Sequence, residues 1–196
     1  KTLRSSKQGV VDPEKKYIFS GRERHSSSRY LNWGYPQRMI RSQEYLLTWN
    51  MKPERWPAGA PQRIVAGTTD ELWPMYGIKE DGKHESSWAF TDIDGAPTKS
   101  YIIENMNDEK VKPFFDLALG KRPEFEMFNI KEDPFCLNNL IGNADFTDIE
   151  KEMKAVLLEE LKKSEDPRIV GSDKEVFDSY IRYSQMREFP KPVGVE

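Results

Sequence analysis

A short loop near the N-terminus concentrates side chains that bind oxyanions. The segment Gly21-Arg22-Glu23-Arg24-His25 is followed by three serines at positions 26–28. Arginine suits sulfate and carboxylate groups because its planar guanidinium donates two parallel hydrogen bonds. An imidazole can donate a hydrogen bond to a substrate oxygen or exchange a proton. We therefore expect Arg22, Arg24 and His25 to bind an anionic substrate.

The same loop also has an ordinary explanation. Arg22 and Arg24 can form ion pairs with Glu23 or with a neighbouring domain, and His25 can be a simple loop residue. The spacing of these residues alone leaves both explanations open.

The loop follows a predicted strand at residues 17–19, which ends at Ser20-Gly21. The end of a strand is a usual place for binding residues in α/β proteins. Residues 37–42 and 44–50 are rich in β-formers and lie close enough together to form a hairpin, and residues 124–130 predict a further strand. Between them, residues 51–97 contain five prolines and no sustained period, which predicts a long irregular excursion.

The clearest helix is predicted at residues 145–163, because its apolar residues recur at helical spacing. They are Phe146, Ile149, Met153, Val156, Leu157 and Leu161. Two short helices are predicted around residues 101–103 and 114–119, the second closed by Gly120, and an amphipathic stretch follows at 174–182. Residues 1–16 are polar and predict an extended lead-in.

Composition favours a globular chain of one domain, or one domain with an appended segment. Of the 196 residues, 37% are hydrophobic and 12% aromatic, which is more than disordered sequences carry. The single cysteine, Cys136, excludes an intramolecular disulfide and a multi-cysteine zinc site, and no apolar run is long enough for a membrane span.

Charge is distributed unevenly along the chain. Residues 1–63 hold 13 Lys and Arg against 5 Asp and Glu, whereas residues 64–196 hold 17 against 28. A basic region raises the local concentration of anionic ligands, although it can also be a solvated surface. The overall pI of about 5.6 and the lack of a known recognition motif argue against nucleic acid.

Other candidate motifs predict no chemistry. Asp92-Ile93-Asp94-Gly95 begins like a calcium loop, but Ile103 stands where the closing Glu belongs, so a turn is expected. His84 lies in irregular chain and is expected in solvent. Cys136 lies between two apolar residues, which predicts an inert thiol with a raised pKa.

Several segments, taken in order, resemble the C-terminal part of the sulfatase family, and in particular its bacterial heparan N-sulfatase (N-sulfoglucosamine sulfohydrolase) branch. The first is the loop at 21–25, and the next are Gly34-Tyr35-Pro36-Gln37-Arg38-Met39-Ile40-Arg41, Tyr45-Leu46 and Asp94-Gly95-Ala96-Pro97-Thr98-Lys99. The last runs from Arg122 to Pro134, with Asn138-Asn139-Leu140 after it, and differs from the family signature at Met127, Phe128 and Asn129. The match covers nearly the whole chain.

The resemblance implies an α+β subdomain with a small antiparallel sheet of about four strands, packed by a long C-terminal helix. It assigns residues 1–35 to the end of the catalytic region, with its basic substrate-side loop, and residues 36–196 to the sulfatase C-terminal subdomain. It also implies a periplasmic or secreted protein whose substrate is a sulfated, heparan-like carbohydrate.

The family's catalytic group is missing. Sulfatases make a formylglycine from a Cys/Ser-x-Pro-x-Arg motif beside a calcium ion, yet Cys136 is followed by Leu137, Asn138, Asn139 and Leu140, and no serine fits the motif. We therefore expect no catalytic residue, metal ligand or cofactor in this chain, which should be a fragment that is inactive alone.

The expected partners are the N-terminal catalytic part of the same protein and a sulfated carbohydrate. Tyr30, Trp33, Trp49, Trp56 and Trp73 are expected to face the missing part, and the isolated domain can then self-associate. Two other readings stay open: a stand-alone module that binds acidic polysaccharide, and a domain that only braces the catalytic part.

Overall fold

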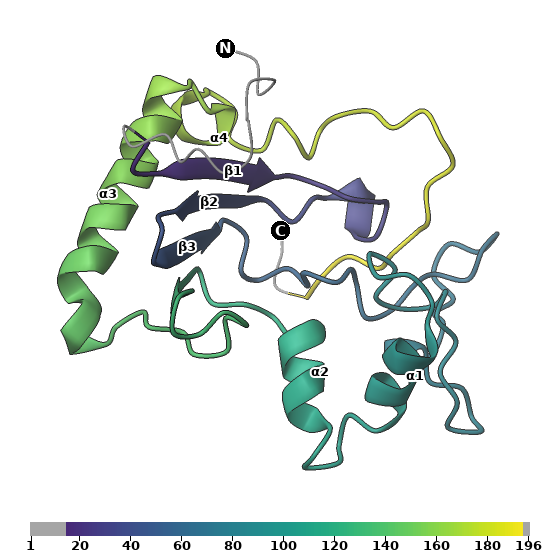
Figure 1. The fold of residues 1–196 in the computed structure, drawn as a ribbon. Coiled ribbons are helices and arrows are strands. Elements are labelled where there is room, and N and C mark those ends of the chain that lie inside the picture. Colours follow the sequence, from purple (N-terminus) through teal and green to yellow (C-terminus); the bar gives the residue numbers. More distant parts are fainter. Residues whose placement is uncertain (1–14, 194–196) are drawn as a thin grey trace, which may run out of the picture.

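A four-stranded antiparallel sheet organises the chain in the computed structural model, which describes residues 15–193 (Figure 1). The strands are β1 (Ile18–Arg22), β2 (Gln37–Arg41), β3 (Tyr45–Asn50) and β4 (Phe125–Asn129), and they lie side by side in chain order. The expected hairpin is β2 and β3, with Ile40 opposite Leu47. The predicted lead-in at 1–16 lies almost wholly outside the described residues.

The helix α3 (Thr147–Lys163) covers one face of this sheet (Figure 1). The 3-10 turn η3 (Ala144–Phe146) precedes it. Every third or fourth residue of α3 is apolar, so one stripe of the helix can be removed from water. Its buried side chains are Met153, Leu157 and Leu161, and they pack on Ile40, Leu47 and Met127 of the sheet. The predicted helix and its apolar stripe are confirmed.

A second core lies under the irregular excursion. The helices α1 (Pro97–Glu104) and α2 (Lys112–Ala118) contribute Ile103 and Phe115 to it. Phe90 and Ala89 of the excursion are fully buried against them. The excursion itself contains only isolated bridges and the 3-10 turn η2 (Met75–Gly77), in agreement with the sequence.

Lys99 binds backbone carbonyl groups at the end of the excursion. Its side chain is buried, and its ammonium group lies 3.0 to 3.2 Å from the carbonyl oxygens of Ser86, Ala89, Phe90 and Ile93. Burial lowers the pKa of Lys99 to about 8, an effect that Asp94 opposes, so the charged form prevails at neutral pH. The chain from 86 to 93 is thereby folded around one cation.

The C-terminal segment leaves α3 through the short helix α4 (Pro167–Val170) and then runs without regular structure beside the sheet to the excursion (Figure 1). The amphipathic spacing at 174–182 suggests a helix, but the structure has none there. Residues 174–178 form turns, and residues 180–182 have no regular structure. Its carbonyl groups bond to other elements: Arg168 donates to Lys174 O and Arg24 to Phe177 O. Tyr180 and Ile181 are exposed.

The fold class is therefore α+β, as expected, with a four-stranded antiparallel sheet and a packed C-terminal helix. Strand β1 pairs with β2 in the same sheet. The domain boundary expected at residue 35 therefore falls between two hydrogen-bonded strands. No helix among residues 15–193 combines the length and apolarity needed to cross a bilayer.

Candidate anion-binding site

Asp92 fixes the loop that the sequence singled out. Its Oδ2 lies 2.7 Å from Arg29 Nη2, and its Oδ1 accepts hydrogen bonds from Ser26 N at 3.1 Å and Ser26 Oγ at 2.9 Å. The side chains of Arg29 and Asp92 are only 4% and 3% exposed. Although burial opposes ionisation, the charge and hydrogen bonds of Arg29 lower the pKa of Asp92. This carboxylate is therefore charged and holds the loop in one conformation.

Two of the three expected binding residues flank that carboxylate at the surface. Arg22 Nη2 lies 3.7 Å from Asp92 Oδ2, and His25 Nδ1 lies 3.4 Å from Asp92 Oδ1. Their side chains stay 40% and 66% exposed. The structure thus brings Arg22 and His25 together around Asp92 and leaves both accessible to a ligand.

Arg24, the third expected binding residue, points into the protein. Its Nη1 donates to Asn32 O at 2.6 Å, and its Nη2 donates to Phe177 O at 3.4 Å. These bonds tie the loop to the turn η1 (Tyr30–Asn32) and to the C-terminal segment. The expected alternative, an ion pair of Arg22 or Arg24 with Glu23, is not formed among the described residues, because Glu23 accepts hydrogen bonds from Arg38 and Arg168 instead.

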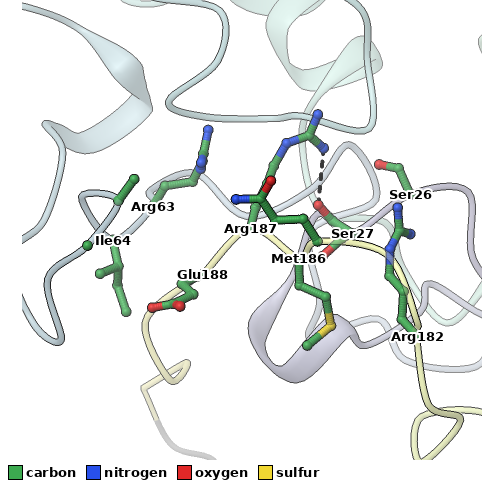
Figure 2. A pocket seen from close by; sticks show the side chains of 11 residues that line it. Ser26, Ser27, Arg63, Ile64, Arg182, Met186, Arg187 and Glu188 are labelled. Carbon is green, nitrogen blue, oxygen red and sulfur yellow. Dashed lines mark hydrogen bonds between the residues drawn. The ribbon is translucent and has the colours of Figure 1, made fainter.

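The serines that follow this loop open onto a hollow of about 440 Å³ (Figure 2). Ser26 and Ser27 form one wall, Arg63 comes from the excursion, and Arg182 and Arg187 come from the C-terminal segment. We call this the arginine hollow. Its single acidic wall residue is Glu188, so positive charge is in excess there.

The arginines of the arginine hollow are not neutralised by nearby carboxylates. Among the described residues, no Asp or Glu lies within ion-pair distance of Arg63, Arg182 or Arg187. Arg63 donates to Ser87 O, while its Nε is buried without a hydrogen-bond partner in the described chain. Burial, followed by the charge of Arg187, lowers the pKa of Arg63. A bound anion would relieve that repulsion.

Ser27 contributes two polar groups to the wall of the arginine hollow, a backbone carbonyl that is hydrogen-bonded and a hydroxyl that is not bonded within the described chain. Ser27 O accepts a hydrogen bond from Arg187 Nη1 at 3.2 Å, drawn as the dashed line in Figure 2. Ser27 Oγ is buried with no partner among residues 15–193. Ser26 Oγ bonds to Asp92 and lies 2.5 Å from Ser28 Oγ. Ser26, which lines the arginine hollow, therefore connects it with Asp92.

Sequence reasoning missed the arginines of the hollow. Ser27 and Arg187 are separated by 160 positions, and the backbone bond from Ile64 N to Glu188 O at 3.0 Å brings the excursion to the C-terminal segment. Arg63 and Arg187 lie in stretches without a period, so no local pattern could have paired them. The excess of basic residues before position 64 was a signal for Arg63 alone, because Arg182 and Arg187 lie in the acidic part of the chain.

No known family model matches this chain, and no curated protein matches it in sequence. Among residues 15–193, no three His, Cys, Asp or Glu side chains gather where they could hold a metal ion.

Proposed function

We propose that this chain is the C-terminal part of a sulfatase that hydrolyses sulfate ester or N-sulfate groups on a heparan-like glycan, and that the arginine hollow binds the sulfated sugar. The observation that supports the proposal is the convergence of Arg63, Arg182 and Arg187 with two serines on one hollow. The α+β fold with its four-stranded sheet is of the kind that the family resemblance implies.

The chemistry of the hollow suits a sulfate group. A sulfate oxygen accepts two or more hydrogen bonds, and guanidinium groups donate them in pairs. Ser27 Oγ and Arg63 Nε are buried donors that have no partner in the described chain, and leaving such groups unpaired is costly. A small readjustment that turned either donor toward a bound anion would recover that cost.

His25 and Arg22 do not line the arginine hollow and would contact the part of the glycan that extends beyond it. Both are exposed, and both are oriented by the buried Asp92. The loop connects to the arginine hollow through Ser26, whose backbone and hydroxyl also bind Asp92. Arg24 would contribute indirectly, because it holds the loop to Asn32 and Phe177.

Bond cleavage would be performed by groups outside this chain. A formylglycine and a calcium ion would supply the nucleophile and the stabilisation of oxyanion charge. We expect no turnover of sulfated sugars or aryl sulfates by this chain alone. We also expect a Cys/Ser-x-Pro-x-Arg motif in the gene upstream of Lys1, and its absence there would contradict the sulfatase assignment.

Binding can be tested directly on the chain. Heparan oligosaccharides and the same oligosaccharides after chemical desulfation would be titrated by calorimetry at about 50 and about 200 mM salt. We expect the sulfated form to bind at least about tenfold more tightly, since each charged hydrogen bond contributes roughly 1.5–3 kcal/mol.

A matched pair of variants locates the site. Arg187→Gln removes one charge from the arginine hollow, whereas Lys162→Gln removes one charge from the exposed end of α3. We expect about a tenfold loss of affinity for Arg187→Gln and little change for Lys162→Gln. Equal effects of the two changes would mean that binding depends only on net charge, and would contradict a defined site.

A further inference from the structure

A second hollow, of about 510 Å³, is lined in part by residues 190–193 of the C-terminal segment. It shares no wall residue with the arginine hollow, although three stretches of chain contribute to both, and Lys121, which follows α2, lines only the second hollow. Residues 26–27 and 63–64 line the arginine hollow. Residues 29–30 and 60–62 line the second hollow. Phe189, which is buried, lies between the residues of the C-terminal segment that face each hollow.

The wall of this second hollow is largely aromatic and apolar. Tyr30, Trp33 and Trp56 contribute rings, and Leu72 and Met75 contribute apolar side chains that are nearly half exposed. Tyr30 and Trp33 meet edge to face, with their ring centroids 5.2 Å apart. We call this the aromatic hollow. A ring-shaped ligand can cover these surfaces and remove them from water.

Basic side chains lie close to two of those rings. Arg55 lies 4.6 Å from the centroid of the Trp33 ring, and Lys121 lies 5.6 Å from that of Trp56. Arg29, Arg55, Lys121 and Lys191 line the aromatic hollow, against the one carboxylate of Glu54. The wall therefore favours an anionic ligand.

Part of this positive charge has no internal partner. Arg29 and Arg55 are matched by Asp92 and Asp178, at 2.7 and 2.9 Å. Arg29 Nη1 and Arg55 Nε are nevertheless buried without a hydrogen-bond partner in the described chain. Within residues 15–193, Lys121 and Lys191 have no carboxylate at ion-pair distance.

We propose that the aromatic hollow binds a sugar ring that carries a carboxylate, a uronic acid, of the same glycan whose sulfated sugar lies in the arginine hollow. Its ring would pack against Trp33 and the apolar wall, and its carboxylate would accept hydrogen bonds from Lys121 and Lys191. The proposal rests on the proposed function only for the statement that both sugars belong to one glycan. The aromatic hollow itself needs no sulfate.

The test uses an unsulfated oligosaccharide of alternating glucuronate and N-acetylglucosamine, and the same oligosaccharide with its carboxyl groups reduced to alcohols. Calorimetry with the whole chain should show binding of the first and at least about tenfold weaker binding of the second. Lys121→Gln combined with Lys191→Gln should weaken binding of the first about tenfold. Both lysines are at the surface, so the fold should persist, and circular dichroism checks it.

Arg187→Gln separates this proposal from the proposed function. It should weaken binding of the sulfated oligosaccharide by a larger factor than binding of the unsulfated one, because Arg187 lines only the arginine hollow. Lys162→Gln should leave both affinities within about twofold of the wild type. The uronate proposal is overturned if the carboxyl-reduced sugar binds equally well, or if the double lysine variant binds like the wild type. The proposed function fails separately, if sulfation does not increase affinity or if Arg187→Gln does not reduce it.

Discussion

Glu23 and Arg168 lie 145 positions apart in the sequence and form a two-point ion pair in the fold. Glu23 Oε2 accepts from Arg168 Nε at 2.9 Å and from Nη2 at 2.8 Å. The other carboxylate oxygen, Oε1, accepts from Arg38 Nη2 at 2.6 Å. Glu23 thus joins the candidate binding loop to β2 and to α4, and it fixes the base of the loop from which Arg22 and His25 project.

Glu23→Gln should therefore destabilise the protein. Arg38 and Arg168 are both buried, and of their carboxylate partners Arg38 would keep Asp166, whereas Arg168 would keep Glu175 and Asp178. Because Glu23 is partly exposed, we expect a loss of about 2 kcal/mol in the free energy of unfolding, measured by urea denaturation. The exposed Glu109→Gln is the control and should change stability by less than about 0.5 kcal/mol. A similarly small effect for Glu23→Gln would show that the pair contributes little.

A second prediction concerns Lys99, whose ammonium group organises residues 86–93. Lys99→Met keeps the length and apolar character of the stem but removes every donor, so carbonyl groups that it now satisfies are left unpaired in a buried place. We expect a loss of about 3 kcal/mol in unfolding free energy and faster proteolysis within the excursion. The exposed Lys110→Met should change neither. Unchanged protease resistance in Lys99→Met would contradict this role.

The sheet and α3 could be predicted from the sequence because each depends on local pattern. Residues 37–50 contain two β-rich stretches separated by a short turn, and 145–163 repeats its apolar residues with the period of a helix. Phe125 and Met127 also face the expected core. In these elements a short stretch of sequence is enough to predict the secondary structure.

The candidate site could be predicted only in part, because contacts between distant segments build it. The sequence identified the loop containing Arg22 and His25, but it gave Arg24 the same role, and Arg24 is used internally. At 174–182 the apolar spacing suggested a helix, but there the backbone bonds to arginine side chains from elsewhere. His84, expected in solvent, is buried, and Phe135 and Leu137 around Cys136 are exposed.

The buried position of His84 predicts a pH effect on stability. Burial, followed by the charge of Lys99, lowers the pKa of His84 below 6.5, although Glu104 and Glu85 oppose this. Its Nδ1 lies 2.9 Å from Ser100 Oγ, and its Nε2 has no partner among the described residues. The unfolded chain then binds more protons than the folded one near and below pH 6.5, so stability falls as the pH decreases through that range.

Urea denaturation at about pH 7.5 and about pH 5.5 measures this effect. His84→Phe keeps a ring of similar size but cannot take up a proton, so its stability should fall less over the same interval than that of the wild type. The quantity compared is the change in unfolding free energy between the two pH values. A constant loss of stability from the missing bond to Ser100 cancels in that difference. Equal changes for the two proteins would mean that His84 does not contribute to the pH dependence.

The last prediction separates two neighbouring residues to which the sequence gave one role. His25 is 66% exposed, and Asp92 is its one charged partner among residues 15–193, whereas Arg24 donates to Asn32 O and Phe177 O. His25→Ala should weaken binding of the sulfated oligosaccharide about tenfold or more, because one hydrogen bond to an anion contributes roughly 1.5–3 kcal/mol. It should leave the urea midpoint unchanged.

Arg24→Ala should show the opposite pattern. Losing its two internal bonds should lower the unfolding free energy by about 1–2 kcal/mol, and affinity should fall only as far as the loop loses order. Both variants would be measured in urea and by calorimetry with the same oligosaccharide. If His25→Ala binds within about twofold of the wild type, well under 1 kcal/mol, then His25 is an ordinary loop residue and the arginine hollow must bind the sulfate without it.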